Sequence, residues 1–258
     1  MSTVGLVRHQ FRYDQRTFWR EPASVFFTVA LPILFLVLFV SIFGNDPTTV
    51  DGHEIKGATY YLPGIMTLAI VSATFVNLAI SVTGARERGI LKRLRSTPLP
   101  PWVYMAGRIC TASVVTVVMM VLLIGLGGLF YDVTIPTTTL PALVLTVVVG
   151  TASFCAMGFA LTAVVPSESG APPITNAVVL PLYFLSGLFV PEEQLPGAMR
   201  ILADIFPVKH LFRALLTAFD PTTTGTGIEF GHLAVLAAWG VVALVFATRS
   251  FRWVPRAG

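Results

Sequence analysis

The sequence predicts an all-α polytopic membrane protein with six transmembrane helices, an N-terminal amphipathic interfacial helix and re-entrant helices between spans five and six. Of the 258 residues, 55% are hydrophobic and only 12% are charged, whereas soluble domains carry about a quarter charged residues. Six long segments contain no Asp, Glu, Lys or Arg, and about 20 apolar residues suffice to cross a bilayer. We therefore treat residues 1–258 as a single transmembrane domain.

Residues 1–21 are predicted to form a helix that lies in the membrane interface. Four arginines recur at intervals of four residues, and apolar side chains form a second row at near-helical spacing: Arg8, Arg12, Arg16 and Arg20, beside Val4, Val7, Phe11 and Phe18. Such a helix can place its arginines among lipid phosphates, so membrane lipids are expected partners. A solvated basic tail is the alternative interpretation. The segment does not resemble a cleavable signal peptide, because the apolar run that follows is too long and lacks a small-residue cleavage site.

The six predicted spans are about 23–43, 60–84, 109–131, 140–165, 171–190 and 230–248. Pro32 and Pro181 lie inside spans, where neighbouring helices can satisfy the freed backbone groups. Residues 191–229 contain two apolar pieces, Leu195–Phe206 and Val208–Phe219, on either side of Pro207. Each piece is too short to cross the membrane and carries charge, so we predict re-entrant or interfacial helices in an extracellular loop.

The basic residues indicate the orientation of the chain. With six spans, the two termini and the loop of residues 85–101 lie on one side. That side, with Arg108, holds thirteen of the 17 Lys and Arg residues. Because cytoplasmic loops of membrane proteins carry the excess of basic residues, we expect both termini to be cytoplasmic and the protein to lie in a bacterial plasma membrane. The same rule accounts for the net charge of +4 without a nucleic-acid partner.

Several chemistries have no sequence support. Cys110 and Cys155 lie in apolar runs without CxxC spacing, and the four histidines are scattered, so neither a disulfide framework nor a metal site is expected. No acid–base cluster suggests an enzyme. A phosphate-binding loop ends in Gly-Lys-Ser/Thr, but every lysine here follows Ile, Leu or Val. The chain is therefore expected to bind no cofactor, and any uphill transport must draw its energy from a partner.

The densest charge cluster, residues 84–99, reads Gly-Ala-Arg-Glu-Arg-Gly-Ile-Leu-Lys-Arg-Leu-Arg-Ser-Thr-Pro-Leu. It resembles the cytoplasmic loop of the type-2 ATP-binding-cassette exporter permeases. In that family the pattern Arg-Glu-x-Gly-x-Leu-x-x-Leu-x-x-Thr-Pro marks the coupling helix, which docks on the ATPase subunit. The matching residues are Arg86, Glu87, Gly89, Leu91, Leu94, Thr97 and Pro98.

A second segment carries the same resemblance. Its matching residues are Asn176, Leu180-Pro181, Phe184 to Phe189, Pro191, Leu195-Pro196, Phe206-Pro207 and Arg213. They are similar to the family's Phe-Leu-Ser-Gly segment, which leads into re-entrant extracellular helices. Val208-Lys209-His210 departs from the more neutral stretch usual there, which leaves the chemistry of an external gate open. With the interfacial helix and six spans, the resemblance covers essentially the whole chain.

The coupling loop itself has two helical faces. Ile90, Leu91 and Leu94 cluster on one side, whereas Arg88, Lys92 and Arg95 mark another. We expect the apolar ridge to enter a groove on a soluble partner, although a basic loop bound to anionic lipid is the alternative. Glu87 could pair with a partner arginine or internally with a neighbour such as Arg88. Gly89 and Pro98 are expected to bound this helix.

The resemblance implies a mechanism and a set of site residues. Two permease copies, or this chain and a homologue, would pair around a pathway, and two ATPase subunits carrying ATP and Mg would bind below. The implied pathway contacts are Asn77, Asn176, Tyr183, Phe184 and Ser186, and the implied external gate contains Pro191, Pro196, Pro207 and Arg213. For Asn77, hydrogen bonding to a neighbouring helix and lining a pathway both stay open.

Compact loops resemble the drug- and antibiotic-export branch, so the expected substrate is amphipathic or lipid-like: a drug, an antibiotic or a lipid. The alternatives are a secondary transporter or channel, which would need titratable groups inside the membrane, and a membrane scaffold that transports nothing.

Overall fold

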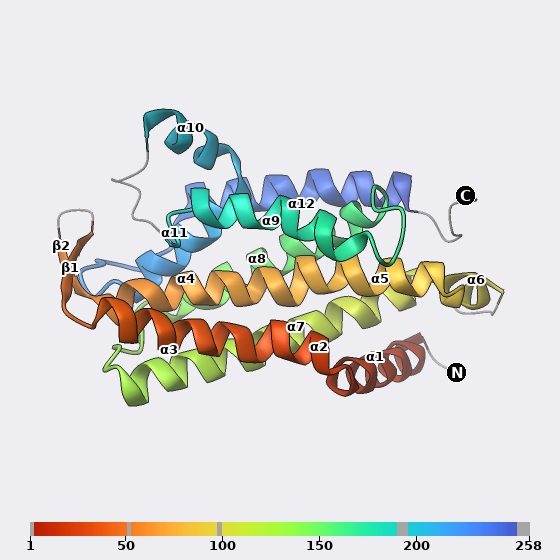
Figure 1. Cartoon of the computed structure of the whole chain (residues 1–258), viewed down its shortest axis with the longest axis horizontal. Helices are drawn as coiled ribbons and strands as arrows, with labels where there is room; N and C mark the ends of the chain where they lie inside the picture. The colour runs from red at the N-terminus through yellow and green to blue at the C-terminus, as the bar shows by residue number, and fades with distance from the viewer. Residues whose placement is uncertain (1–2, 51–52, 97–99, 190–195, 252–258) are drawn as a thin grey trace.

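A computed structural model describes residues 3–50, 53–96, 100–189 and 196–251, and it confirms a mostly helical bundle whose long helices run along one axis (Figure 1). The elements, in order, are α1 (Thr3–Arg20), α2 (Pro22–Val25), η1 (Phe26–Ala30), α3 (Leu31–Phe43), β1 (Pro47–Val50), β2 (His53–Lys56), α4 (Gly57–Val71), η2 (Ser72–Val76), α5 (Asn77–Glu87), α6 (Ile90–Arg95), α7 (Pro101–Phe130), α8 (Leu140–Thr162), α9 (Ala171–Leu185), α10 (Gly197–Ile205), α11 (Pro207–Phe219) and α12 (Phe230–Ser250).

Five helical segments in the described part of the chain are long and apolar enough to cross a membrane: Pro22–Phe43, Gly57–Glu87, Trp102–Phe130, Leu140–Thr162 and Phe230–Ser250. The expected fifth span is shorter than predicted. It ends at Leu185 rather than at residue 190, and Gly187 follows with a φ of 84°, a left-handed conformation that glycine adopts without steric cost. The third span starts earlier than predicted, so Arg108 lies two turns inside α7 instead of in the preceding loop.

Two π-helical turns interrupt the long spans. In the first span η1 ends two residues before Pro32, and a proline cannot donate to the carbonyl four residues earlier. In the second, η2 begins at Ser72. Nearby threonines bond within their own helix: Thr74 Oγ1 donates to the carbonyl of Ile70 at 2.6 Å, and Thr67 Oγ1 to that of Pro63 at 2.9 Å. The hydroxyls of these two threonines are therefore satisfied by the backbone of their own helix.

The centre of the bundle is α4, in which nearly every residue is buried. Small residues allow the neighbouring helices to come close, as is usual between membrane helices. A Cβ added to Gly240 of α12 would lie 2.7 Å from Ser153 Oγ of α8, and one added to Gly150 of α8 would lie 2.7 Å from Leu211 of α11. The short helix α11 is therefore wedged into the bundle, with eleven of its residues buried.

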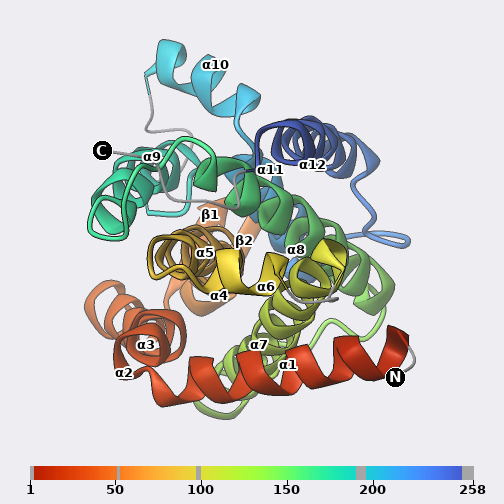
Figure 2. The same ribbon diagram turned by 90° about the vertical axis from the view of Figure 1, so that its right-hand side faces the viewer.

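The two ends of the bundle differ. Figure 1 shows α1, α6, the α8–α9 turn and the last turn of α12 at one end, and the β1–β2 hairpin, α10 and α11 at the other. The hairpin, in which Pro47 pairs with Lys56 and Val50 with His53, was not predicted; it occupies the polar loop between the first two spans. The pieces on either side of Pro207 are helical, as predicted, and Figure 2 shows α10 lying apart from the packed helices.

Helix α1 lies across α7 at the first of these ends (Figure 2). Its buried row consists of Gln10, Asp14 and Phe18, whereas Val4 is 78% exposed. The predicted apolar face is thus wrong in part, because two polar residues occupy the side that packs on α7. Gly107 makes this approach possible: a Cβ there would lie 2.5 Å from Gln10 Cγ.

Candidate functional site

The loop with the densest charge folds into a short helix at the end of the bundle. Helix α5 stops at Glu87, Gly89 takes a left-handed φ of 70°, and α6 runs from Ile90 to Arg95. The predicted start of this helix at Gly89 is confirmed. Thr97 and Pro98 lie outside the described residues, so the predicted end at Pro98 stays a prediction.

The apolar side of α6 packs against its own chain. Leu91 is fully buried in a cluster with Tyr104 of α7, Phe159 of α8 and Ala247 of α12, and its neighbours Ile90 and Leu94 pack against that cluster. The prediction that this ridge enters a groove on a partner is therefore wrong for Leu91, whereas Ile90 and Leu94 are only partly buried, and docking through them stays a prediction. The pattern identified an apolar face correctly, but the surface that covers it is the end of the bundle itself.

The exposed side chains that the structure describes on α6 are basic. Lys92 and Arg93 are exposed, and the side chain of Arg88 in the preceding turn is 57% exposed. We call Arg88, Lys92 and Arg93 the basic face. Any soluble partner that reaches α6 meets these charges, and a surface of complementary charge would be steered toward them.

Arg86 has a structural position. It is buried, and its guanidinium donates to the carbonyl oxygens of Thr162 at 2.6 Å (Nη1) and Val165 at 2.5 Å (Nη2). Thr162 is the last residue of α8 and Val165 lies in the segment that follows, so the guanidinium sits at the C-terminal end of this helix, where a cation is favoured. The prediction that Arg86 contacts the ATPase is thus corrected: its charged group lies inside the chain and holds α5 to α8.

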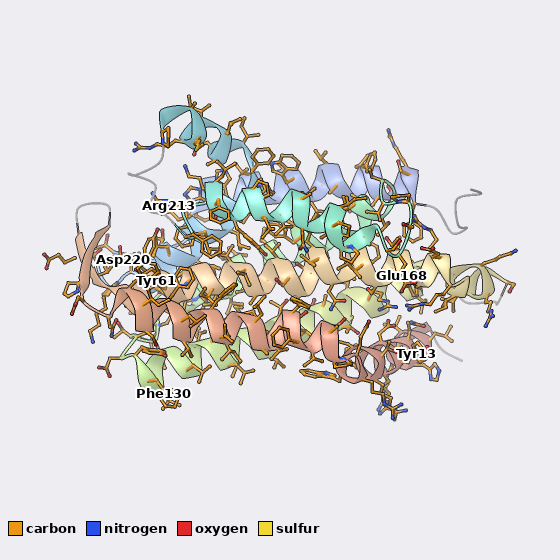
Figure 3. The ribbon with its side chains drawn as sticks, in the orientation of Figure 1. Tyr13, Tyr61, Phe130, Glu168, Arg213 and Asp220 are labelled. Atoms are coloured by element: carbon orange, nitrogen blue, oxygen red, sulfur yellow. The ribbon has the colours of Figure 1, made fainter. Side chains whose placement is uncertain are left out.

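Glu87 and Arg88 connect α5 to the turn between α8 and α9. A Glu87 carboxylate oxygen accepts a hydrogen bond from the backbone N–H of Glu168, and Arg88 Nη1 lies 2.9 Å from Glu168 Oε1. The lack of a side chain at Gly84 lets this turn approach α5 closely, since a Cβ there would lie 2.8 Å from Glu168 Oε1. We call Glu87, Arg88 and Glu168 the clamp. Figure 3 labels Glu168 at this end of the bundle.

Sequence reasoning missed Glu168, although it lies in the tight turn Pro166–Gly170 on the same predicted side as the basic loop. It also missed Asp14, which is buried on α1 and lies 3.4 Å from Arg108 Nε of α7. Gln10 Nε2 donates to both carboxylate oxygens of Asp14 at 3.1 Å. Burial raises the pKa of Asp14, although Arg108 and Gln10 act in the opposite direction. An acidic residue within an arginine-rich helix was the available signal.

The five predicted pathway residues differ in burial within one chain. Tyr183 and Ser186 are buried, with the Tyr183 hydroxyl 3.4 Å from the carbonyl oxygen of Leu68 and Ser186 Oγ donating to that of Tyr183 at 2.8 Å. Both side chains lie inside the core of this chain, and their role in a pathway stays a prediction. Asn176 and Phe184 are exposed on α9, and Asn77 is partly buried at the start of α5.

The predicted gate residues lie at the opposite end. Pro196 precedes α10, Pro207 opens α11, and Arg213 is partly buried on α11; Pro191 is outside the described residues. Figure 3 labels Arg213 and Asp220 near this end. Their role in a gate stays a prediction. Among the described residues, no group of three or more His, Cys, Asp or Glu could hold a metal ion.

Comparison with known proteins adds the family context. Residues 6–219, from α1 to the end of α11, match the family described as ABC-2 type transporter. The chain is 29% identical over 240 residues to the daunorubicin resistance ABC transporter permease protein DrrB1 of Streptomyces coeruleorubidus, with 90% of this chain and 79% of that protein covered. It is 22% identical over 224 residues to the inner membrane transport permease YadH of Escherichia coli, covering 83% of this chain and 87% of that protein.

Proposed function

This chain belongs to the ABC-2 type transporter family, and from that premise we propose that it is the transmembrane subunit of an exporter driven by ATP hydrolysis on a separate ATPase subunit. The observation that carries the proposal is the attachment of α6. Leu91 fixes it to three other helices, and the clamp links its entry turn to the α8–α9 turn. A force on α6 therefore reaches several spans together rather than bending a loose loop.

The ATPase subunit meets the basic face in this proposal. Because Leu91 is buried, we expect the partner to meet Arg88, Lys92 and Arg93, which are exposed basic groups among the described side chains of α6 and its entry turn. The groove that receives them is expected to be acidic, because like charges juxtaposed in an interface cost several kcal/mol. ATP and Mg belong to that partner.

The remaining parts of the proposal concern cargo and assembly. An amphipathic or lipid-like substrate, such as a drug, an antibiotic or a lipid, leaves the cell between two copies of this chain or between this chain and a homologue. The name of the Streptomyces relative, which refers to resistance to the drug daunorubicin, supports this class of cargo. Exposed apolar side chains of α3 and α9, among them Leu38 and Phe184, suit either lipid or a second copy.

The orientation belongs to the same proposal. The end that holds α1, α6 and the last turn of α12 faces the cytoplasm of a bacterium, because this end carries the excess of basic residues. Both termini are then cytoplasmic, and the hairpin, α10 and α11 face outward.

Purification from the native membrane tests the proposal directly. The chain alone is expected to show no ATPase activity, and a cassette ATPase subunit is expected to co-purify and to hydrolyse ATP. Transport that follows the proton gradient and ignores ATP would instead support a secondary transporter. Absence of any nucleotide-binding protein from the purified complex would contradict the proposal.

Charge reversal on α6 tests the contact surface. The double variant Lys92→Glu/Arg93→Glu is expected to lower the affinity for the ATPase subunit at least about tenfold, because it sets acidic groups against an acidic groove. Binding is measured by titration of the purified subunit onto the permease in lipid nanodiscs.

The matched control is Arg12→Glu/Arg16→Glu, which makes the same change of net charge on exposed positions of α1 at the same end. It is expected to weaken binding to anionic lipid and to leave the ATPase affinity unchanged. Equal losses from both double variants would show that a general charge effect, rather than docking through α6, governs the association.

A further inference from the structure

Two histidines meet at the end of the bundle opposite α6. His210 of α11 and His232 of α12 are 22 positions apart in the sequence, and their Nδ1 atoms lie 2.7 Å apart. The ring centroids are separated by 5.0 Å, and His210 is only 8% exposed. A separation of 2.7 Å between two nitrogens requires a hydrogen bond, in which one nitrogen carries the proton and the other accepts it.

The backbone decides where the protons are when both rings are neutral. Nε2 of His210 lies 2.8 Å from the carbonyl oxygen of Asp204. A carbonyl oxygen can only accept, so Nε2 of His210 carries a hydrogen, and the Nδ1 of the neutral ring has a free lone pair. His232 must then donate from its own Nδ1. The two hydrogen bonds thus run in one direction: His232 of α12 donates to His210 of α11, and His210 donates to the Asp204 carbonyl oxygen at the end of α10.

We propose that His210 and His232 form a proton-binding site that accepts one additional proton while α11 and α12 stay in contact, and that a second proton separates the two helices at this end. With one extra proton, an imidazolium Nδ1–H still faces an unprotonated Nδ1, and the charged hydrogen bond is stronger than the neutral one. With two, both Nδ1 atoms carry hydrogens at a separation that permits only one. The contact must then open.

The surrounding charges come from three elements. Lys209 of α11 is 2.5 Å from Asp204 of α10, which joins these helices by an ion pair. Arg213 of α11 and Glu229, just before α12, are further charged groups near His232. On the other sides of α11, Phe212 packs on Tyr60 of α4, and Leu211 lies against Gly150 of α8. Histidine is the side chain whose ordinary charge change falls between pH 5 and 8.

A second contact of α12, made by Trp239, contains no titratable side chain. Trp239, seven residues after His232, donates from Nε1 to the carbonyl oxygen of Ile205 at 2.8 Å, and its ring stacks on Phe206 with centroids 6.2 Å apart. Protonation of the histidine pair would therefore loosen the start of α12 against α11, while the corner between α10 and α11 stays attached. The outer end of the bundle would then respond to the pH of the medium, independently of the force that the ATPase subunit exerts on α6 at the opposite end.

Proton linkage gives the expected slope. In this proposal the separated histidines can hold two extra protons, whereas the closed pair can hold only one. The opening equilibrium then rises about tenfold for each unit by which the pH falls, because the open state takes up one more proton. Hydrogen–deuterium exchange of α11 in the full chain, in lipid nanodiscs between pH 7.5 and pH 5, measures this opening after correction for the intrinsic exchange rate.

His232→Asn is the decisive variant. The asparagine amide can donate to neutral His210 or, after rotation, accept from protonated His210, so the contact survives and no second proton is involved. Its exchange is expected to be independent of pH, whereas the exposed His9→Asn on α1 should behave as the wild type. A wild type without pH dependence, or the same slope in His232→Asn, would overturn the proposal.

Nitrogen-15 spectra of labelled histidine side chains provide a readout that needs no variant at position 232. In the wild type at pH 7.5, one ring is expected to show the Nε2–H form and one the Nδ1–H form, joined by a hydrogen bond. Two well-separated steps of proton uptake are expected on acidification. Simultaneous uptake of both protons, with the α11 amides still protected, would contradict the site even if His232→Asn does not fold.

Discussion

Replacing Arg108 with alanine is expected to lower the free energy of unfolding by about 3–5 kcal/mol, because the change leaves a charged carboxylate buried without its cation. The Asp14 side chain has no exposed surface, and Arg108 Nε lies 3.4 Å from it. Arg108 also donates to the Tyr104 hydroxyl at 3.2 Å and sits over that ring at 5.4 Å from the centroid. Loss of these contacts adds to the effect and detaches α1 from α7.

The size of this loss depends on pH in a definite direction. Burial raises the pKa of Asp14, and Arg108 opposes that rise, so removal of Arg108 raises the pKa further. Between the pKa of the unfolded chain, about 3.9, and this higher value, the folded state binds more protons than the unfolded state. Stability then falls as pH rises, and the deficit of Arg108→Ala is expected to shrink when the pH is lowered from 7.5 to 5.

A double variant provides the control. Asp14→Leu/Arg108→Met replaces the ion pair with apolar side chains, and such replacements of buried pairs are often neutral or stabilising. It is expected to lie within about 1 kcal/mol of the wild type when unfolding is followed by denaturant titration in micelles. A double variant as unstable as Arg108→Ala would show that packing volume, not the unpaired carboxylate, causes the loss.

Replacing Glu87 with lysine is expected to reduce transport at least about tenfold, the scale of a coupling energy between two sites, while the protein still folds. The Glu87 carboxylate accepts the backbone N–H of Glu168, and an ammonium group can only donate. The substitution also sets a second cation beside Arg88. Motion of α6 would then no longer be passed to the α8–α9 turn, in which Glu168 lies three positions before the start of α9. Substrate efflux from reconstituted vesicles with the ATPase subunit measures the loss.

Two variants separate the clamp from general damage. Glu87→Gln keeps an oxygen that can accept the Glu168 N–H, so it is expected to retain most of the transport. The exchange Arg88→Glu/Glu168→Arg keeps an ion pair of reversed polarity and is expected to restore transport relative to Glu168→Arg alone. Unchanged stability is expected throughout, since an exposed ion pair contributes about 1 kcal/mol or less. Normal transport by Glu87→Lys would remove Glu87 from the coupling role.

Local patterns predicted some features of the site and not others. The helix boundary at Gly89 and the helical segments around Pro207 follow from residues next to each other in the chain, and the structure confirms both. The apolar face of α6 was also predicted, but the surface that packs against it was not. A periodic pattern shows that a face must be covered and contains no information on which surface covers it.

The sequence by itself determined the fold class, the approximate spans, the helical segments after the fifth span and the short helix after Gly89, because hydropathy and backbone preference act within one segment. Only the tertiary structure decided that Arg86 caps α8, that Glu168 completes the clamp, that Asp14 meets Arg108 and that His210 meets His232. Each of these contacts joins segments far apart in the chain, and each depends on how the helices are rotated and aligned along the bundle. Within the described part of the charged loop, packing separates buried Arg86 and Leu91 from the exposed basic face.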